Sequence, residues 1–229
     1  MKCGSGLAFS TAYEVTTESD GRRALERLEE TAPDVAIVDS GGANIASLKF
    51  ALTRLGVAGE LTVDPAVIRS ASHVIMPGVG AARSAMDRLQ ETGLDRLIPQ
   101  LKQPVLGICL GLQLMFEKSE EDNTDCLGIL PGSVLRFSPA PGRPVPHMGW
   151  NQVRKLRNSA LMADVPDNSY FYFVHSYAAE TGEMTVGCTE YGWPFAAVVA
   201  SGNFLATQFH PERSGPLGAQ VLRNFLERY

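Results

Sequence analysis

The chain has 229 residues, of which 45% are hydrophobic and 20% charged, and its formal net charge is −5. This length allows one α/β domain with a sizeable core. The mild acidity, without a run of basic residues, gives no reason to expect a nucleic acid partner, and no apolar stretch approaches the length of a membrane span. Because the N-terminus also has no secretory h-region, we expect a cytoplasmic protein that binds neither nucleic acid nor membrane.

The cysteine pattern indicates reduced thiols. The four cysteines are at positions 3, 109, 126 and 188, and they form no Cys-x-x-Cys pair. Their spacing also does not match that of metal ligands. We therefore expect no metal and no other cofactor, and a cysteine free to react.

Residues 1–33 carry the weakest signals in the chain. They are polar, with one helical pattern before Pro33, and fit a tail, an added helix or the artefact of an early start codon. The stretch from Tyr13 to Asp39 also looks like the middle of a response-regulator receiver domain, but a receiver needs an acidic pair on an earlier strand and none precedes Glu14. We therefore expect an N-terminal extension over residues 1–33 and a single domain over residues 34–229.

From residue 34 onward, strand and helix patterns alternate. Short apolar runs predict strands at Val35–Val38, Leu61–Val63, Val74–Met76, Val105–Ile108 and Phe204–Phe209, and helical spacing predicts helices near Leu48–Leu55, Ala81–Leu89 and Leu217–Arg228. This alternation predicts an α/β fold with a mostly parallel sheet flanked by helices. Two runs between prolines and glycines predict antiparallel strands laid beside that sheet: Val134–Phe137 and Tyr170–Val174.

Cys109 is where a predicted strand turns into a predicted helix, since Leu112 and Met115 recur at helical spacing after it. Gly107 and Gly111 allow the sharp turn, so Gly-x-Cys-x-Gly is typical of a nucleophile elbow with sulfur in place of hydroxyl. A thiol in the first turn of a helix faces unpaired amides and the positive end of the dipole, which favour the thiolate. The local pattern fits a small buried apolar residue equally well.

The loop Pro77-Gly78-Val79-Gly80 follows a predicted strand and precedes a predicted helix. Its simplest interpretation is a tight turn. Thiol chemistry on an acyl group, however, needs two amide donors aimed at the developing oxyanion, one of them from the residue after the nucleophile. Leu110 would supply the first amide and Val79 the second.

His210 and Glu212 flank Pro211 at the end of a predicted strand. Side chains two apart in extended backbone share a face, so the carboxylate can hold one ring nitrogen while the other faces a nucleophile. This arrangement suits a general base, although a surface loop can carry such a pair by chance. The other histidines precede a strand or lack a nearby acid: His73, His147 and His175.

Taken together, Pro-Gly-Val-Gly at 77–80, Gly-Ile-Cys-Leu-Gly-Leu-Gln at 107–113 and His-Pro-Glu at 210–212 resemble the motifs of class I, triad-type glutamine amidotransferases. Within that class, Pro-His-Met-Gly-Trp-Asn at 146–151 and Tyr-Phe-Val-His-Ser-Tyr at 172–177 resemble the glutaminase subunits of imidazole glycerol phosphate synthases. The related glutaminase of pyridoxal phosphate synthase would carry a Gly-Gly-Glu-Ser type loop at 77–80. The resemblance spans about Val35–Tyr229, and the chain departs from it in residues 1–33 and in the loop Ser40–Asn44.

The resemblance implies a glutaminase of histidine biosynthesis that supplies ammonia to a (β/α)8-barrel cyclase in a heterodimer. It implies that Cys109 is the nucleophile and that His210 and Glu212 complete the triad. By the same match, glutamine would contact Gly78, Gly80, Gln113, Tyr172, His175, Ser176 and Tyr177, and the face toward the cyclase would include Asn44, Trp150 and Arg213.

Two alternatives remain open at this stage. Trp150 also fits plain core packing. The whole chain also fits a non-catalytic interaction module on a glutaminase fold, but such a module usually loses a triad member, and Cys109, His210 and Glu212 are all present.

Overall fold

The computed structural model describes residues 33–41 and 45–229. Residues 1–32 of the expected extension lie outside the described residues, and so does most of the stretch from Tyr13 to Asp39 that resembled a receiver domain. Asn44, predicted for the partner face, also lies outside them. Within the described ranges, no helix is both long and apolar enough to cross a membrane.

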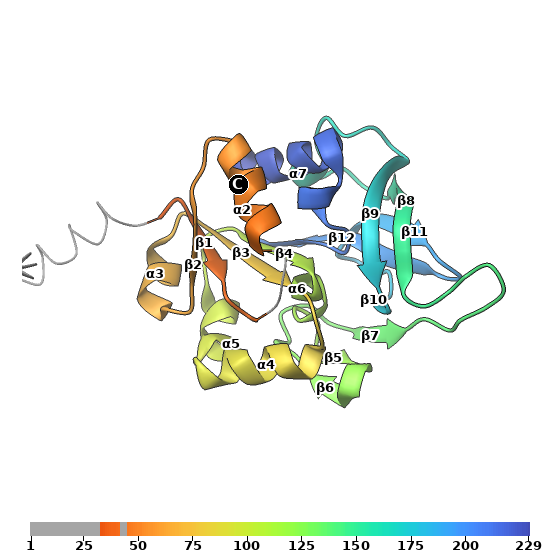
Figure 1. The fold of residues 1–229 in the computed structure, drawn as a ribbon, viewed down its shortest axis with the longest axis horizontal. Coiled ribbons are helices and arrows are strands. Elements are labelled where there is room, and N and C mark those ends of the chain that lie inside the picture. The colour runs from red at the N-terminus through yellow and green to blue at the C-terminus, as the bar shows by residue number, and fades with distance from the viewer. Residues whose placement is uncertain (1–32, 42–44) are drawn as a thin grey trace, which may run out of the picture. The chain divides into compact units, whose positions relative to one another are not determined.

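A nine-stranded sheet runs through the domain (Figure 1). Its first part is parallel, in the order β2 (Gly59–Thr62), β1 (Val35–Val38), β3 (His73–Gly78), β4 (Val105–Cys109) and β13 (Phe204–Thr207). The antiparallel part continues with β12 (Pro194–Ser201), β11 (Thr185–Glu190), β8 (His147–Lys155) and β9 (Ser169–His175). The predicted α/β fold with antiparallel additions is therefore confirmed, and β9 is the predicted strand around Tyr170–Val174.

Helices cover both faces of the sheet (Figure 1). One face carries α2 (Ile45–Arg54) and α7 (Gly215–Arg228), and the other carries α3 (Pro65–Ser70), α4 (Ala82–Glu91) and α5 (Leu94–Leu97). All of β1 is buried, and its side chains alternate between the two hydrophobic clusters. A strand buried on both faces reads as a continuous apolar run, which is why β1 was evident from sequence.

A second, four-stranded sheet has the order β10 (Tyr177–Ala179), β7 (Ser133–Arg136), β5 (Lys118–Ser119) and β6 (Thr124–Asp125). The prediction that Val134–Phe137 lies beside the main sheet is therefore wrong. This strand pairs with β10 and β5 instead. Hydrophobic alternation identifies a strand but does not identify its partners, which here come from distant parts of the chain.

The three motifs meet at the carboxyl ends of adjacent parallel strands. Strand β4 lies between β3 and β13, so Cys109 at its end is paired in register with Gly78 at the end of β3. On the other side, β13 ends at Thr207, three residues before His210. Ligands of open α/β sheets bind at this edge, beyond the carboxyl ends of the strands.

The turn at Cys109 depends on close backbone packing. Cys109 has φ 55° and ψ −108°, a strained conformation for a residue with a side chain. A Cβ added to Gly111 would overlap the carbonyl oxygen of Met76 on β3, and one added to Gly78 would lie 2.8 Å from the Cβ of Leu110. The elbow therefore requires glycine at these positions for space.

The helix after the elbow is shorter than predicted. Helix α6 (Leu110–Gln113) has only four residues. The carbonyls of Leu114 and Met115 accept from amides in the segment 127–130 instead of from a further helical turn. The helix dipole that was expected to favour the thiolate is correspondingly small. Any stabilisation of a thiolate must therefore come mainly from side chains and amides close to the sulfur.

The packing of the elbow predicts that Gly111→Ala is strongly destabilising. Because the new methyl group meets the backbone of β3, which cannot move alone, we expect a loss of about 3 kcal/mol in the free energy of unfolding, measured in urea. Gly182→Ala is the matched control, since nothing lies within 4 Å of the added Cβ. Equal losses in the two variants would contradict this account of the elbow.

Candidate active site

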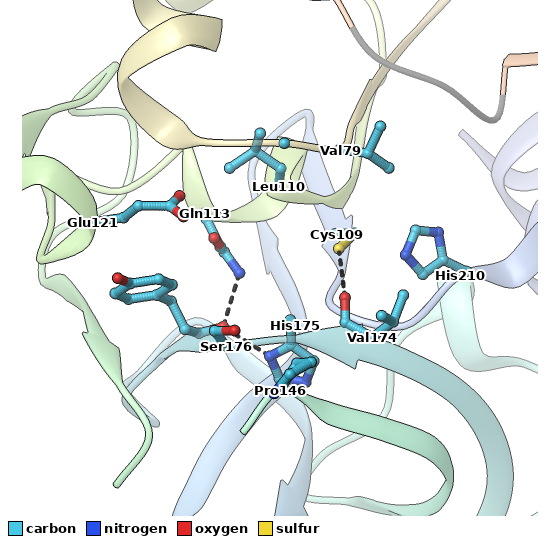
Figure 2. Close-up of a pocket in the computed structure, with 12 residues that line it drawn as sticks. Val79, Cys109, Leu110, Gln113, Glu121, Pro146, Val174, His175, Ser176 and His210 are labelled. Carbon is cyan, nitrogen blue, oxygen red and sulfur yellow. Dashed lines mark hydrogen bonds between the residues drawn. The ribbon is translucent and has the colours of Figure 1, made fainter. Parts of the chain in front are cut away.

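A cavity of about 340 Å³ opens at the carboxyl ends of β3 and β4. Figure 2 shows its walls, which come from the loop after β3, the elbow, the end of β9 and the start of η4 (Pro211–Arg213). Its lining contains most of the residues predicted for the site: Val79, Gly80, Cys109, Leu110, Gln113, Glu121, Pro146, Val174, His175, Ser176, Tyr177 and His210.

Two predicted pocket residues do not line this cavity. Gly78 packs against Leu110 in the wall behind it. Tyr172 lies on the face of β9 opposite to the buried Phe171 and Phe173, with its ring 4.9 Å from the guanidinium carbon of Arg213. We expect neither residue to touch a molecule bound in the cavity.

Cys109, His210 and Glu212 come together as predicted. The Nδ1 atom of His210 donates to Oε1 of Glu212 over 2.8 Å, and the two side chains are only 4% and 3% exposed. Cys109 and His210 line the same cavity (Figure 2). The carboxylate thus fixes the imidazole tautomer and orientation, as in a catalytic triad.

The surroundings of His210 favour its charged form. Burial alone would lower the pKa of His210, but the nearby sulfur of Cys109 and the partner carboxylate of Glu212 outweigh burial and raise the pKa to about 10. An imidazolium at neutral pH beside a cysteine stabilises the thiolate, which is the nucleophilic form.

A chain of hydrogen bonds supports the wall of the cavity that contains His175. His175 Nδ1 donates to the carbonyl of Tyr177 over 2.7 Å, so its Nε2 accepts from Nδ1 of His147 over 3.1 Å. The amide of Asn151 donates to the remaining nitrogen of His147. Burial lowers the pKa of His147 to about 4 and that of His175 to about 3. Both rings are therefore neutral at pH 7 and hold one tautomer each.

Sequence analysis missed two polar residues of the site, Glu121 and Gln208. Glu121 lines the cavity, and its Oε2 accepts from the backbone amide of Ala82 over 2.7 Å, at the start of α4. Burial raises the pKa of Glu121. In sequence it belongs to a Ser-Glu-Glu-Asp run that gives no local signal of function. Gln208 lies two residues before His210, but residues 208 and 209 form a bend after β13, so the period of a strand does not place the two side chains on one face.

The face proposed for a partner is only partly described. Trp150 on β8 is 56% exposed, which rules out the alternative that it is a core residue. Arg213 is exposed too, and its guanidinium lies over the ring of Tyr172.

The model of the family "Glutamine amidotransferase class-I" matches residues 36–229. The chain therefore belongs to the class-I glutamine amidotransferases. The subunit HisH of imidazole glycerol phosphate synthase from Xanthomonas axonopodis pv. citri is 52% identical over 194 residues, which is 85% of this chain and 97% of the relative. The HisH subunit from Xylella fastidiosa strain Temecula1 is 50% identical over the same shares. Within its class, the chain belongs to this HisH family of glutamine amidotransferase subunits.

Solved structures agree on the fold. A crystal structure of a glutamine amidotransferase is similar with a TM-score of 0.66 and 19% identity, covering 85% of this chain and 97% of the other. The structure of PurLQS from Thermotoga maritima gives a TM-score of 0.63 and 18% identity, covering 86% of this chain and 99% of the other. At this identity the likeness shows a shared fold.

The buried His175 predicts that the protein loses stability in mild acid. The unfolded chain binds a proton at this residue near pH 6.5, whereas the folded chain does so only near pH 3. The contribution of His175 to stability is therefore complete above pH 6.5 and falls as pH drops, by at most about 1.4 kcal/mol per pH unit. His210, with a raised pKa, is protonated in both states below pH 6.5 and adds no slope there.

Urea unfolding between pH 6.5 and pH 5 measures this effect. We expect His175→Asn to be less stable than the wild type at pH 7 but to lose less on acidification, because the proton-binding difference at this position is gone. Identical slopes in the two proteins would contradict a neutral buried His175.

Proposed function

We propose that the chain hydrolyses the side-chain amide of glutamine to glutamate and ammonia, and passes the ammonia to a (β/α)8-barrel cyclase in histidine biosynthesis. The observation that carries this proposal is that Cys109 and His210 line one cavity and that Glu212 is bonded to the ring of His210. The membership of the HisH family supports the same reaction and implies a partner subunit.

In the first half of the reaction, the thiolate of Cys109 attacks the amide carbon of glutamine and the carbonyl electrons move to oxygen. Val79 and Leu110 both line the cavity beside the sulfur, and their backbone amides are our candidates for the oxyanion hole. Each such donor contributes roughly 3 to 4 kcal/mol to the stabilisation of the transition state. The carbon–nitrogen bond then breaks, and the imidazolium of His210 protonates the departing ammonia.

In the second half, neutral His210 takes a proton from water as the water attacks the thioester. The carbon–sulfur bond breaks, glutamate leaves and the thiolate–imidazolium pair is restored. Glu212 stabilises the imidazolium in both halves through its 2.8 Å contact with Nδ1.

The lining of the cavity suits the polar end of an amino acid. Glu121 is its acidic member, so we infer that it binds the α-ammonium group of glutamine. Gly80, Gln113, Ser176 and Tyr177 complete the proposed pocket, and neutral His175 lines it and holds its wall.

A row of exposed apolar side chains marks the proposed partner face. Met148 and Trp150 on β8 are 67% and 56% exposed, and Tyr170 on β9 is 54% exposed. In the register of the two strands, Met148 is paired with Val174, which lines the cavity. A partner that covers this row would therefore sit beside the site where ammonia forms. This position suits a cyclase that must receive ammonia before water protonates it.

The triad assignment predicts a separation of two activities in the complex with the cyclase and its nucleotide ligand. Cys109→Ala should abolish glutamate release while synthesis from added ammonia stays intact, because glutamine hydrolysis needs the thiolate and the cyclase reaction does not. His210→Ala should slow glutamate release by about 10³-fold or more, and Glu212→Gln should have a smaller effect. Loss of the ammonia-dependent reaction in Cys109→Ala would assign that residue a structural role.

The partner face predicts that Trp150→Ala weakens binding of the cyclase. Removal of a large aromatic anchor from the centre of an interface typically costs about 2 kcal/mol, or roughly 30-fold in the dissociation constant, measured by calorimetry. Leu61→Ala is the control, since Leu61 is 37% exposed on β2 at the opposite edge of the sheet. A dissociation constant unaffected by Trp150→Ala would place the interface elsewhere.

A further inference from the structure

Gln208 is a fully buried amide that contacts the nucleophile. Its Nε2 atom lies 3.7 Å from Sγ of Cys109, within hydrogen-bond range for sulfur, and its Oε1 atom lies 3.1 Å from Nε2 of Gln113. The side chain is 0% exposed, so it exchanges no hydrogen bonds with solvent. The triad does not account for it.

The orientation of this amide is fixed by its neighbours. Nε2 of Gln113 donates to the carbonyl oxygen of Tyr177 over 2.8 Å, and a carbonyl can only accept. The atom of Gln208 that meets the same NH₂ group must therefore be the oxygen. The NH₂ group of Gln208 consequently faces the sulfur, as a donor.

A donor at this position matters because the backbone carbonyl that contacts the sulfur is an acceptor. The carbonyl oxygen of Val174 lies 3.8 Å from Sγ of Cys109, where it can accept from the thiol but repels a thiolate. The short α6 helix adds little positive potential. Alongside His210, the amide of Gln208 is a donor within hydrogen-bond range of the sulfur, where it favours the charged form.

We propose that Gln208 is a positioning residue for the nucleophile: held by Gln113, it donates a hydrogen bond to the thiolate of Cys109 and both stabilises and orients it. This inference rests on the proposed function of Cys109. Gln113 then has a second role besides lining the pocket. Its NH₂ group donates both to the carbonyl of Tyr177 in the pocket wall and to the amide of Gln208 that contacts the sulfur.

The test measures the pH dependence of alkylation of Cys109 by iodoacetamide in the full chain, quantified by mass spectrometry of the peptide that contains this cysteine. Gln208→Met keeps the length of the side chain and removes the donor. We expect the midpoint of the alkylation profile to move to higher pH, with a rate about tenfold lower at pH 7 and an unchanged plateau at high pH, because charge-assisted hydrogen bonds are the strong ones. A profile that superposes on that of the wild type would overturn the proposal.

The matched control is Asn224→Leu. Asn224 is also a buried amide, 1% exposed, and it donates to the carbonyls of Leu161 and Ala163 outside the cavity. Its loss should lower stability without moving the alkylation profile. A shift of the same size in this variant would mean that general loosening, and not the lost donor, explains the effect of Gln208→Met, and would also overturn the proposal.

A measurement on the wild-type fold decides the matter if Gln208→Met does not fold. The side-chain amide resonance of Gln208 in nuclear magnetic resonance should shift with pH as Cys109 ionises, and this shift should vanish in Cys109→Ala. An amide resonance that ignores the ionisation of the sulfur would contradict the contact. Neither the alkylation profile nor the amide resonance requires glutamine. If the Cys109→Ala variant kept full glutamine turnover, the proposed function would be refuted, while these two measurements would still report on the contact between Gln208 and Cys109.

Discussion

The close contact between the elbow and strand β3 is the constraint on which the site depends. Gly111 lies against the carbonyl of Met76 with no room for a side chain, and Gly78 lies equally close to the side chain of Leu110. These contacts hold Cys109 at the end of β4 in a strained conformation. Because β13 is the neighbour of β4 on the other side, the same arrangement brings His210 to the sulfur from a point about a hundred residues further along the chain.

Around this point the polar groups form one ordered network. From Asn151 through His147 and His175 to the carbonyl of Tyr177, each donor and acceptor has a single possible role. The same carbonyl accepts from Gln113. A fully satisfied buried network fixes geometry more than it adds net stability, because each group removed would leave a partner unsatisfied. The site therefore consists of Cys109 in a strained conformation and a rigid polar wall that faces it.

Sequence patterns predicted the parts of this site whose signals are local. The spacing of Gly-x-Cys-x-Gly reflects short-range sterics, so the elbow could be predicted from sequence. The contact between His210 and Glu212 was also predicted, but for the wrong reason: Pro211–Arg213 form the 3₁₀ helix η4 and not extended backbone, and the carboxylate reaches Nδ1 from that turn. The mostly parallel sheet followed from alternating strand and helix patterns. The sheet joined by Val134–Phe137, the length of α6 and the role of Glu121 depend on contacts between distant segments, such as the amides of 127–130 that replace a helical turn after Gln113.

Covalent labelling tests the central claim, that Cys109 is the charged nucleophile of a glutamine site, most directly. A glutamine-derived electrophile, with peptide mass spectrometry at neutral pH, would report which of the four cysteines reacts. The account predicts one adduct, on Cys109, that forms much more slowly in His210→Ala and is blocked by excess glutamine. An adduct on another cysteine, or labelling of Cys109 that glutamine does not slow, would contradict it.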